Sequence, residues 1–305
     1  MKTYHIINPA AGCGGAEAAC RRRAEKDAVV YRTTGVGDAR RYLAQVLKDE
    51  REECRVYVYG GDGTIGEAVN GIMDADAAEI AALTAVPVGT GNDFVRMFDS
   101  KGTAREYKLD LLRCGDLYAV NMVNIGFDCS VVSKTAEWKK KPFISGAFAY
   151  ILGIISVLLR RLGTEMVIEY TDEEGIAHTE SGTLLLCAIG NAQYYGGGFR
   201  AAPIASMEDG LIDLLVVKRV TRLRFLGLVG LYRVGAHIKE TGETVDRVKD
   251  VLSYIRCRSI KISGIKEACF DGEVRPTSSF TCEVLPRTLR YMTEGKIDGS
   301  IVHGG

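Results

Sequence analysis

Residues 56–73 have the sequence VYVYGGDGTIGEAVNGIM, in which an apolar strand pattern at 56–59 runs through a glycine-rich turn into a helical pattern at 65–73. The glycines between Gly60 and Gly63 allow the backbone to approach a ligand closely. A helix that starts directly after a strand presents free N–H groups and its positive dipole end to an anion. The stretch therefore predicts a phosphate-binding turn, in which Asp62 would hold Mg²⁺ or order its water molecules. A tight turn that is merely built from small residues is the alternative.

Two further turns follow neighbouring predicted strands. The turn NPAAG (8–12) comes after the first strand, and GTGNDF (89–94) comes after a buried-type strand at 84–88. Because the carboxyl ends of parallel strands share one edge of a sheet, we expect all three turns to face the same crevice. The central turn is not a Walker loop, since no Gly-Lys-Ser/Thr follows it, and its glycine spacing is not the GxGxxG of Rossmann dehydrogenases.

The strand and helix patterns predict two different architectures along the chain. Over the first 120 residues, short apolar strands alternate with helical patterns at 16–27 and 38–48, which predicts an α/β domain with a parallel sheet covered by helices on both faces. From a boundary near 105–125, strands joined by tight turns predict a mostly antiparallel β-sandwich. Its expected strands include 165–171, 183–189, 211–217, 259–262, 280–285 and 289–292, and helical patterns interrupt it near 145–162 and 223–238.

Composition excludes several classes of protein. The 305 residues are 47% hydrophobic and 26% charged, which is typical of a globular protein and not of collagen, a coiled coil or a disordered chain. Lys+Arg and Asp+Glu both total 39, so no net charge attracts nucleic acid. The nine cysteines show no CxxC spacing, which argues against a zinc site or a disulfide framework. The histidines form no hydrolytic triad with partners that the sequence can identify. The N-terminus shows no signal peptide, so a cytoplasmic location is expected.

One apolar segment raises the question of membrane contact. Residues 142–159 carry no charge, but they are too few and too diluted by serine and glycine to span a bilayer. We expect a buried or interfacial helix. The basic flanks Lys139–Lys141 and 160–161, and the basic helix Arg219–Lys239, leave contact with a membrane surface open. A solvated face with snorkelling arginines is the alternative for the basic helix.

The motifs together resemble a known family. NPAAG (8–12), GGDGT (60–64), GTGND (89–93), the stretch Gly196–Gly210 and Asp271-Gly272-Glu273 resemble, in order, the motifs of the bacterial soluble diacylglycerol kinases, which are similar to sphingosine and ceramide kinases. The resemblance implies a nucleotide-binding domain over 1–120, like that of NAD kinase and 6-phosphofructokinase. It also implies a β-sandwich lipid domain over 121–285, with 286–305 returning to the first domain.

The resemblance also implies roles for individual residues. Glu273 matches the catalytic base, and Asp209 with the backbone carbonyls of Ser206 and Leu211 matches a structural Mg²⁺ site. Glu67 follows the phosphate turn as in the family, whereas a glycine stands at 66 where asparagine is common. The residues implied in nucleotide binding are Asn8, Thr33, Gly60, Gly61, Asp62, Gly63, Thr64, Ile65, Gly66 and Thr90.

The chemistry of the residues is compatible with these roles. Phosphoryl transfer to an alcohol needs a group that accepts the hydroxyl proton, and a carboxylate in a glycine-hinged turn such as Asp271-Gly272-Glu273 can do so. Without the resemblance, a hairpin turn with solvated acids is the plainer interpretation. Asp110, Asp128 and Asp213 are expected within or beside strands, as structural caps or ladder-edge groups.

The sequence therefore predicts an ATP- and Mg²⁺-dependent lipid kinase that phosphorylates a hydroxyl of diacylglycerol or a related lipid. We expect Asp62 to serve Mg²⁺ and the nucleotide, and Glu273 to take the hydroxyl proton across the interdomain cleft. The alternatives are another small-molecule kinase with the same turn, such as an NAD kinase, or an inactive nucleotide-binding regulator. The expected partner is a lipid substrate at the membrane surface; peripheral contact with the inner face of the membrane and a homodimer both stay open.

Overall fold

The computed structural model describes residues 1–89, 91–98, 103–141, 144, 146–160 and 162–294. The chain forms two compact units, one of Met1–Leu109 together with the chain from Arg287, and one of Asp110–Pro286. Within the described ranges, no helix has the length and apolar character needed to cross a membrane.

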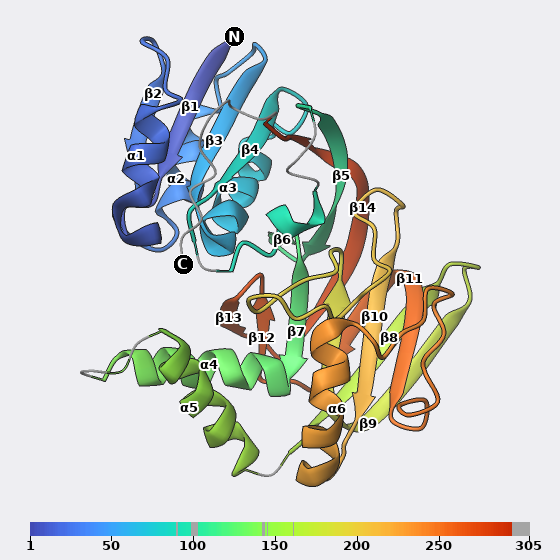
Figure 1. Ribbon diagram of the computed structural model, residues 1–305. Helices are drawn as coiled ribbons and strands as arrows, with labels where there is room; N and C mark the ends of the chain where they lie inside the picture. The colour runs from blue at the N-terminus through green and yellow to red at the C-terminus, as the bar shows by residue number, and fades with distance from the viewer. Residues whose placement is uncertain (90, 99–102, 142–143, 145, 161, 295–305) are drawn as a thin grey trace. The chain divides into compact units, whose positions relative to one another are not determined.

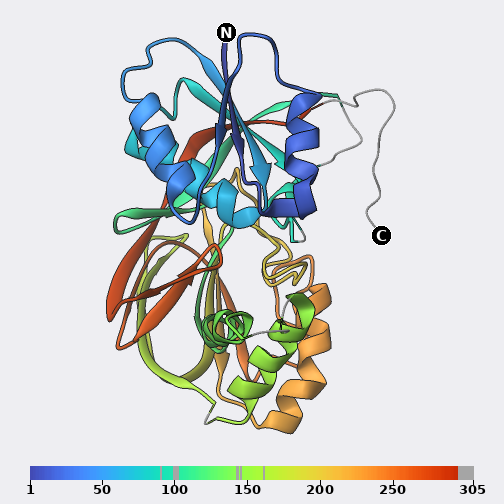
Figure 2. The same cartoon turned by 90° about the vertical axis from the view of Figure 1, so that its left-hand side faces the viewer.

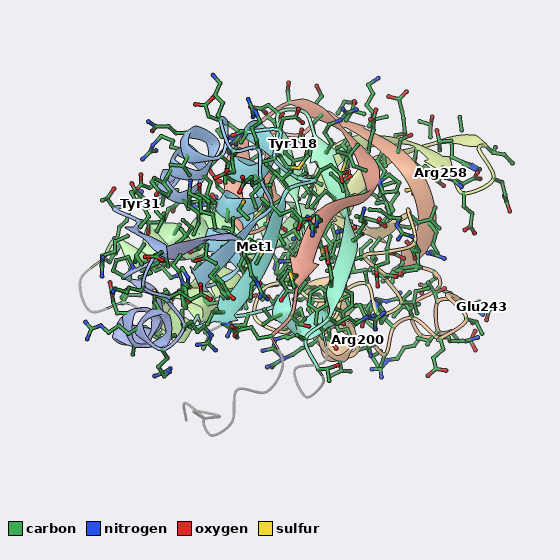
Figure 3. The ribbon with its side chains drawn as sticks, turned by 90° about the horizontal axis from the view of Figure 1, so that it is seen from above. Met1, Tyr31, Tyr118, Arg200, Glu243 and Arg258 are labelled. Carbon is green, nitrogen blue, oxygen red and sulfur yellow. The ribbon has the colours of Figure 1, made fainter. Side chains whose placement is uncertain are left out.

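The first unit is built on a parallel sheet. Its strands are β1 (Lys2–Ile7), β2 (Val29–Arg32), β3 (Cys54–Gly60) and β4 (Ala81–Pro87) in the order β2-β1-β3-β4. The end of β14 (Ser279–Met292) adds a further parallel strand, since Tyr291 pairs with Leu83 of β4. The central strands carry buried side chains on both faces, as expected where helices cover both sides. β2 is the edge strand, and its Tyr31 lies at the outer side of the unit (Figure 3).

The helices of this unit cover both faces of the sheet (Figure 2). They are α1 (Gly15–Arg21), α2 (Asp38–Val46) and α3 (Asp62–Asp74), with short 3₁₀ turns η1 (Ala11–Gly14) and η2 (Val95–Met97). α2 packs closely on α3 because Gly71 has no side chain: a Cβ there would lie 2.7 Å from the carbonyl oxygen of Arg40. α1 ends earlier than the predicted residue 27, because Arg23 Nη1 donates to the carbonyl of Ala19 (3.2 Å) at the helix end.

The second unit is an antiparallel structure in which long strands change partners. The first half of β9 (Ala177–Gly190) pairs with β8 (Thr164–Asp172), and its second half pairs with β10 (Ile212–Lys218) and β7 (Met122–Gly126). In the same way, β11 (Leu252–Ser263) pairs first with β10 and then with β8 and β14. Strands that pass from one layer to the other form the corners of a sandwich. The remaining strands are β5 (Glu106–Cys114), β6 (Leu117–Ala119), β12 (Glu267–Phe270) and β13 (Glu273–Pro276).

Three helices complete the second unit: α4 (Phe127–Lys139), α5 (Gly146–Leu158) and α6 (Arg222–Val234) (Figure 1). They share an apolar core with strands β9 and β10. The predicted fold class, a parallel α/β domain followed by a mostly antiparallel sandwich, is confirmed. The two strands expected at 280–285 and 289–292 form one continuous strand, β14.

Helix α4 was not predicted from the sequence. The apolar residues of α4 do not form a single stripe, so its sequence lacks the helical periodicity that predicted the other helices. Asp128 lies in the first turn of this helix, two residues after the end of β7. Asp110 and Asp213 do lie in strands, β5 and β10, and both are fully buried.

Candidate functional site

The three glycine-rich turns of the first unit meet at one edge of its sheet, as predicted. They follow the carboxyl ends of β1, β3 and β4, which are neighbours. Asn8 Nδ2 donates to Thr64 Oγ1 (3.0 Å), which ties the first turn to the second. The second and third turns touch through backbone, because a Cβ on Gly89 would lie only 2.8 Å from the Cα of Gly61. Glycine at these positions is what allows the turns to converge.

The N-terminus of α3 lies in this group of turns and has the form of an anion site. Its N-cap residue is Gly61, and no side chain caps the helix there. The amide of Thr64 already donates to the carbonyl of Gly61 (3.0 Å), so the amides of Asp62 and Gly63 are the ones that can donate to a phosphate, which the helix dipole also favours. Thr33 is brought close to the end of β1 by its amide, which donates to the carbonyl of Ile7 (2.9 Å).

Other residues implied in nucleotide binding have different surroundings. The side chain of Ile65 is buried in the core and its amide donates to the carbonyl of Gly61 (3.2 Å), while Gly66 lies buried in the next helical position. Thr90 lies outside the described residues. Glu67 accepts hydrogen bonds from the amides of Gly37 (2.7 Å) and Ala39 (3.2 Å), so it caps the N-terminus of α2.

Asp62 is held between two of the turns. Its Oδ1 accepts a hydrogen bond from the amide of Phe94 (2.9 Å), and a Cβ on Gly91 would lie 2.8 Å from its Oδ2. A carboxylate beside phosphate-binding amides suits Mg²⁺, which is usually bound by one or two carboxylates together with phosphate oxygens. Within the described part of the chain, no cluster of three or more His, Cys, Asp or Glu side chains is arranged to bind a metal by itself.

The turn that carries Glu273 belongs to the second unit and is firmly anchored. Asp271 has a positive φ of 45°, and its carboxylate accepts hydrogen bonds from three successive amides, those of Val120 (2.6 Å), Asn121 (2.9 Å) and Met122 (2.9 Å). Glu273 follows as the first residue of β13. Its side chain is half exposed and pairs with Arg275 (3.1 Å). The turn thus presents an accessible carboxylate on a fixed backbone, and Asp271 is not the solvated acid of a plain hairpin.

The loop around Asp209 is also ordered by hydrogen bonds. Asp209 Oδ1 accepts from the amide of Leu211 (3.1 Å), two residues further along the chain, and Gly210 between them has a φ of 70°. Its Oδ2 accepts from Arg256 Nη2, so the carboxylate is already paired with a guanidinium. A Mg²⁺ ion at the predicted site of Asp209, Ser206 and Leu211 would therefore have to share this carboxylate with Arg256 or displace it.

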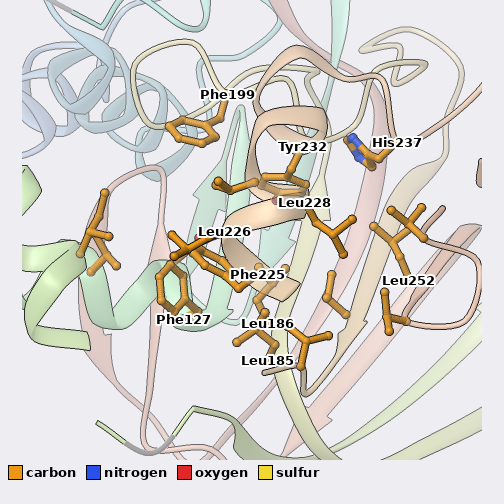
Figure 4. A pocket seen from close by; sticks show the side chains of 18 of the residues that line it. Phe127, Leu185, Leu186, Phe199, Phe225, Leu226, Leu228, Tyr232, His237 and Leu252 are labelled. Atoms are coloured by element: carbon orange, nitrogen blue, oxygen red, sulfur yellow. The ribbon is translucent and has the colours of Figure 1, made fainter. Parts of the chain in front are cut away.

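A largely apolar cavity of about 190 Å³ lies between the three helices and the sheet of the second unit (Figure 4). Phe127 of α4 and Phe225 of α6 pack against each other in its wall, with ring centroids 4.7 Å apart. Its lining comes from segments scattered along the chain, among them Val131, Tyr150, Ile154, Leu186, Val217, Leu228 and Leu252. Such a cavity suits a hydrocarbon chain and offers little to a nucleotide.

A polar group lies in the wall of this cavity. The Tyr195 hydroxyl donates to Asp128 and lies 3.2 Å from the hydroxyl of Tyr232, and all three residues line the cavity. Burial raises the pKa of Asp128 to about 6, although the bond from Tyr195 acts in the opposite direction. A carboxyl group with a shifted pKa in a cavity marks a functional candidate. The signal in the sequence is weak: a single aspartate within the apolar run after Gly126.

Comparison with known proteins identifies the family to which the chain belongs. The profile of the diacylglycerol kinase catalytic domain matches residues 2–125, and that of the YegS C-terminal NAD kinase beta sandwich-like domain matches residues 121–293. The chain belongs to the diacylglycerol kinase family, a family of lipid kinases. The two matched segments include the predicted phosphate turn and the turn that carries Glu273.

Individual members of the diacylglycerol kinase family resemble most of this chain. It is 27% identical over 285 residues to the diacylglycerol kinase of Mycobacterium tuberculosis, with 86% of this chain and 87% of that protein covered. It is also 27% identical over 231 residues to the diacylglycerol kinase of Staphylococcus carnosus, covering 72% of each chain. A crystal structure of a diacylglycerol kinase from Bacillus anthracis shares the fold, with a TM-score of 0.66, 24% identity and coverage of 95% and 96%.

Proposed function

We propose that this lipid kinase transfers the γ-phosphoryl group of ATP, with Mg²⁺, to a hydroxyl of diacylglycerol or a closely related lipid. The observation that carries the proposal is the uncapped N-terminus of α3 at the meeting point of three glycine-rich turns. This arrangement is suited to phosphate groups and lies in the segment that matches the diacylglycerol kinase catalytic domain.

The apolar cavity of the second unit supports a lipid acceptor. Its aromatic and aliphatic lining can take up part of an acyl chain and exclude water from it. A dinucleotide, the acceptor of an NAD kinase, would leave its many polar groups without partners in this cavity. The geometry therefore favours the lipid kinase over the NAD kinase alternative.

In the proposed reaction, Glu273 accepts the proton of the lipid hydroxyl as the oxygen bonds to the γ-phosphorus of ATP. The bond from that phosphorus to the bridging oxygen breaks, and ADP leaves with the electron pair. The amides at the start of α3 would hold phosphate oxygens, and Asn8 would steady the turn through Thr64. Asp62 would hold Mg²⁺, which neutralises charge on the phosphates. The anchored backbone at Asp271 would keep Glu273 in place while the proton moves.

Two variants test the separate roles proposed for Glu273 and Asp62. Glu273→Gln should bind MgATP almost normally but phosphorylate lipid at least about a hundredfold more slowly, because losing a general base typically costs 10²–10⁴ in rate. Asp62→Asn should lose both metal-dependent nucleotide binding and turnover.

The measurements are calorimetric titration with MgATP and initial rates with labelled ATP on a panel of lipids, with NAD as a further acceptor. Near-normal turnover by Glu273→Gln would refute the assignment of the base. A wild-type protein that binds ATP but phosphorylates nothing would instead indicate a nucleotide-binding regulator.

A further inference from the structure

The wall of the apolar cavity holds a short chain of polar groups. Asp128, Tyr195 and Tyr232 are all partly buried and line the cavity. The Tyr195 hydroxyl donates its single proton to Asp128, so the bond of 3.2 Å between the two hydroxyl groups needs the proton of Tyr232. Both hydroxyl protons are therefore used inside this group of three residues, which we call the Asp128 cluster.

The Asp128 cluster offers a ligand hydrogen-bond acceptors but no donors. A carboxylate has about four lone-pair positions, and the bond from Tyr195 fills one of them. Within the residues that the structure describes, no other group donates to Asp128, and no Lys, Arg or His pairs with it. His237 also lines the cavity, but its ring nitrogens face the backbone carbonyls of Leu231 (3.5 Å) and Ala201 (2.9 Å). A ligand that reaches the cluster must therefore bring its own donor.

The charge of Asp128 adds to this need for a donor. Burial raises its pKa to about 6, although the bond from Tyr195 lowers it, so the carboxyl group is mostly ionised at neutral pH. An ionised group that is buried with an incomplete set of partners lowers the stability of the fold. Such a cost is typical of functional sites, and here it indicates a binding role.

A second aspartate of the same unit provides a comparison. Burial also raises the pKa of Asp213 to about 6, and the Tyr254 hydroxyl donates to it (2.5 Å). Unlike Asp128, it has a cation nearby, since Arg256 Nε lies 3.7 Å away, and it does not line the apolar cavity. The same pair of residue types thus occurs once with access to the cavity and once without it.

We propose that the Asp128 cluster selects lipids that carry a second hydrogen-bond donor, an O–H or an N–H group, besides the hydroxyl that is phosphorylated. This inference rests on the proposed function and narrows its substrate class. Beside its reacting hydroxyl, a diacylglycerol has only ester oxygens, which cannot donate. A monoacylglycerol has a second hydroxyl, and an amide-linked lipid has an N–H group. A lipid without such a donor would leave the ionised carboxylate unpaired in an apolar cavity.

The cavity has a polar end for such a donor. Figure 4 shows Phe199 and Tyr232 toward one end of the cavity, and Leu185 and Leu186 toward the other. Aliphatic side chains favour the hydrocarbon of a lipid, because contact with them removes it from water. The polar part of the lipid would therefore lie at the end with Tyr232, where the Asp128 cluster can accept its donor.

The alternative is that the cluster only braces a loop. Tyr195 begins the turn Tyr195–Phe199, in which the glycines at 196–198 have φ values of 61°, 83° and 105°, and Asp128 would hold this turn through the Tyr195 hydroxyl. A neutral side chain of the same shape would brace the turn equally well, since asparagine also accepts a hydrogen bond from a hydroxyl. Only the selection of a donor requires the second carboxylate oxygen of Asp128.

Two pairs of matched lipids test the selection. Monooleoylglycerol is compared with the methyl ether of its central hydroxyl, and dioleoylglycerol is compared with the analogue in which an amide replaces the central ester. The members of each pair differ by one donor, and nonionic detergent micelles present all four lipids in the same way. Wild type should show a kcat/KM at least about tenfold higher for the member with the donor, as expected for a hydrogen bond to a charged group.

The variant Asp128→Asn separates selection from bracing. It should reduce the preference to less than about twofold, because Tyr195 then bonds to the amide oxygen and the NH₂ group, a donor, faces the lipid. Its kcat/KM for dioleoylglycerol should not fall, since an ester oxygen can accept from that NH₂ group. The variant should fold, because it removes a buried charge. Asp213→Asn is the matched control, and it should leave the lipid preference unchanged.

Each other outcome counts against the inference or against the proposed function. Equal kcat/KM within both pairs for wild type would refute the selection, and an equal loss on all four lipids in Asp128→Asn would assign the cluster to bracing alone. If Asp213→Asn also abolishes the preference, the cavity is not its source. If wild type phosphorylates none of the lipids, the proposed function fails, and calorimetric titration of the same pairs without ATP decides the inference. Binding at least about tenfold tighter for the members with the donor upholds it, and equal affinity overturns it.

Discussion

Replacing Asp271 by asparagine tests whether the turn that carries Glu273 is anchored as the structure shows. The Asp271 carboxylate accepts three hydrogen bonds, from the amides of Val120, Asn121 and Met122, at 2.6–2.9 Å. The side-chain amide of asparagine keeps one oxygen. Its NH₂ group would face a backbone N–H, so at least one acceptor is replaced by a donor.

The expected loss follows from the kind of bond removed. A hydrogen bond to a charged group contributes about 1.5–3 kcal/mol, and the site is only partly buried, so Asp271→Asn should lower the free energy of unfolding by about 2–3 kcal/mol. The looser turn should also lower kcat for the lipid while leaving the affinity for MgATP unchanged, because the nucleotide residues belong to the other unit.

Urea unfolding and initial-rate kinetics measure the two effects. Glu273→Gln is the control for stability: it removes a charge two residues away, but its ion pair with Arg275 is half exposed, so the free energy of unfolding should change by less than about 1 kcal/mol. If Asp271→Asn unfolds at the wild-type urea concentration, the three amide bonds contribute nothing and the anchoring argument is wrong.

Three further outcomes are expected. If Asp209 binds Mg²⁺ in place of Arg256, EDTA should lower the melting temperature of the wild type but barely that of Asp209→Asn. Equal changes in the melting temperature of the two proteins would refute a Mg²⁺ site at Asp209. Because burial raises the pKa of Asp128 from 3.8 to about 6, the folded state binds more protons than the unfolded state across that window, so stability should fall as pH rises through it. In Asp128→Asn, the decrease in the free energy of unfolding across this pH range should be smaller by roughly 3 kcal/mol. Urea unfolding at a series of pH values measures it. Gly89→Ala should lower the melting temperature, because its Cβ would press on the backbone of Gly61, whereas Gly63→Ala, with nothing within 4 Å, should not.

The sequence alone was sufficient for the features that depend on local geometry. Glycine turns after apolar strands are visible within a few residues, and a general property of parallel sheets brings them to one edge. The meeting of the three turns, at Asn8 with Thr64 and at Gly61 with Gly89, was therefore predictable without coordinates. The two fold classes were predictable for the same reason, since strand and helix periods are local patterns.

Only the tertiary structure decided which polar groups have partners, because those partners are distant in the chain. Asp271 binds an amide 151 residues away, Asp128 binds a tyrosine 67 residues away, and Asp209 binds an arginine 47 residues away. No local pattern encodes such a separation. The apolar cavity has the same origin: side chains from α4, α5, α6 and the sheet enclose it only after the chain has folded, and folding also leaves one side of α5 exposed.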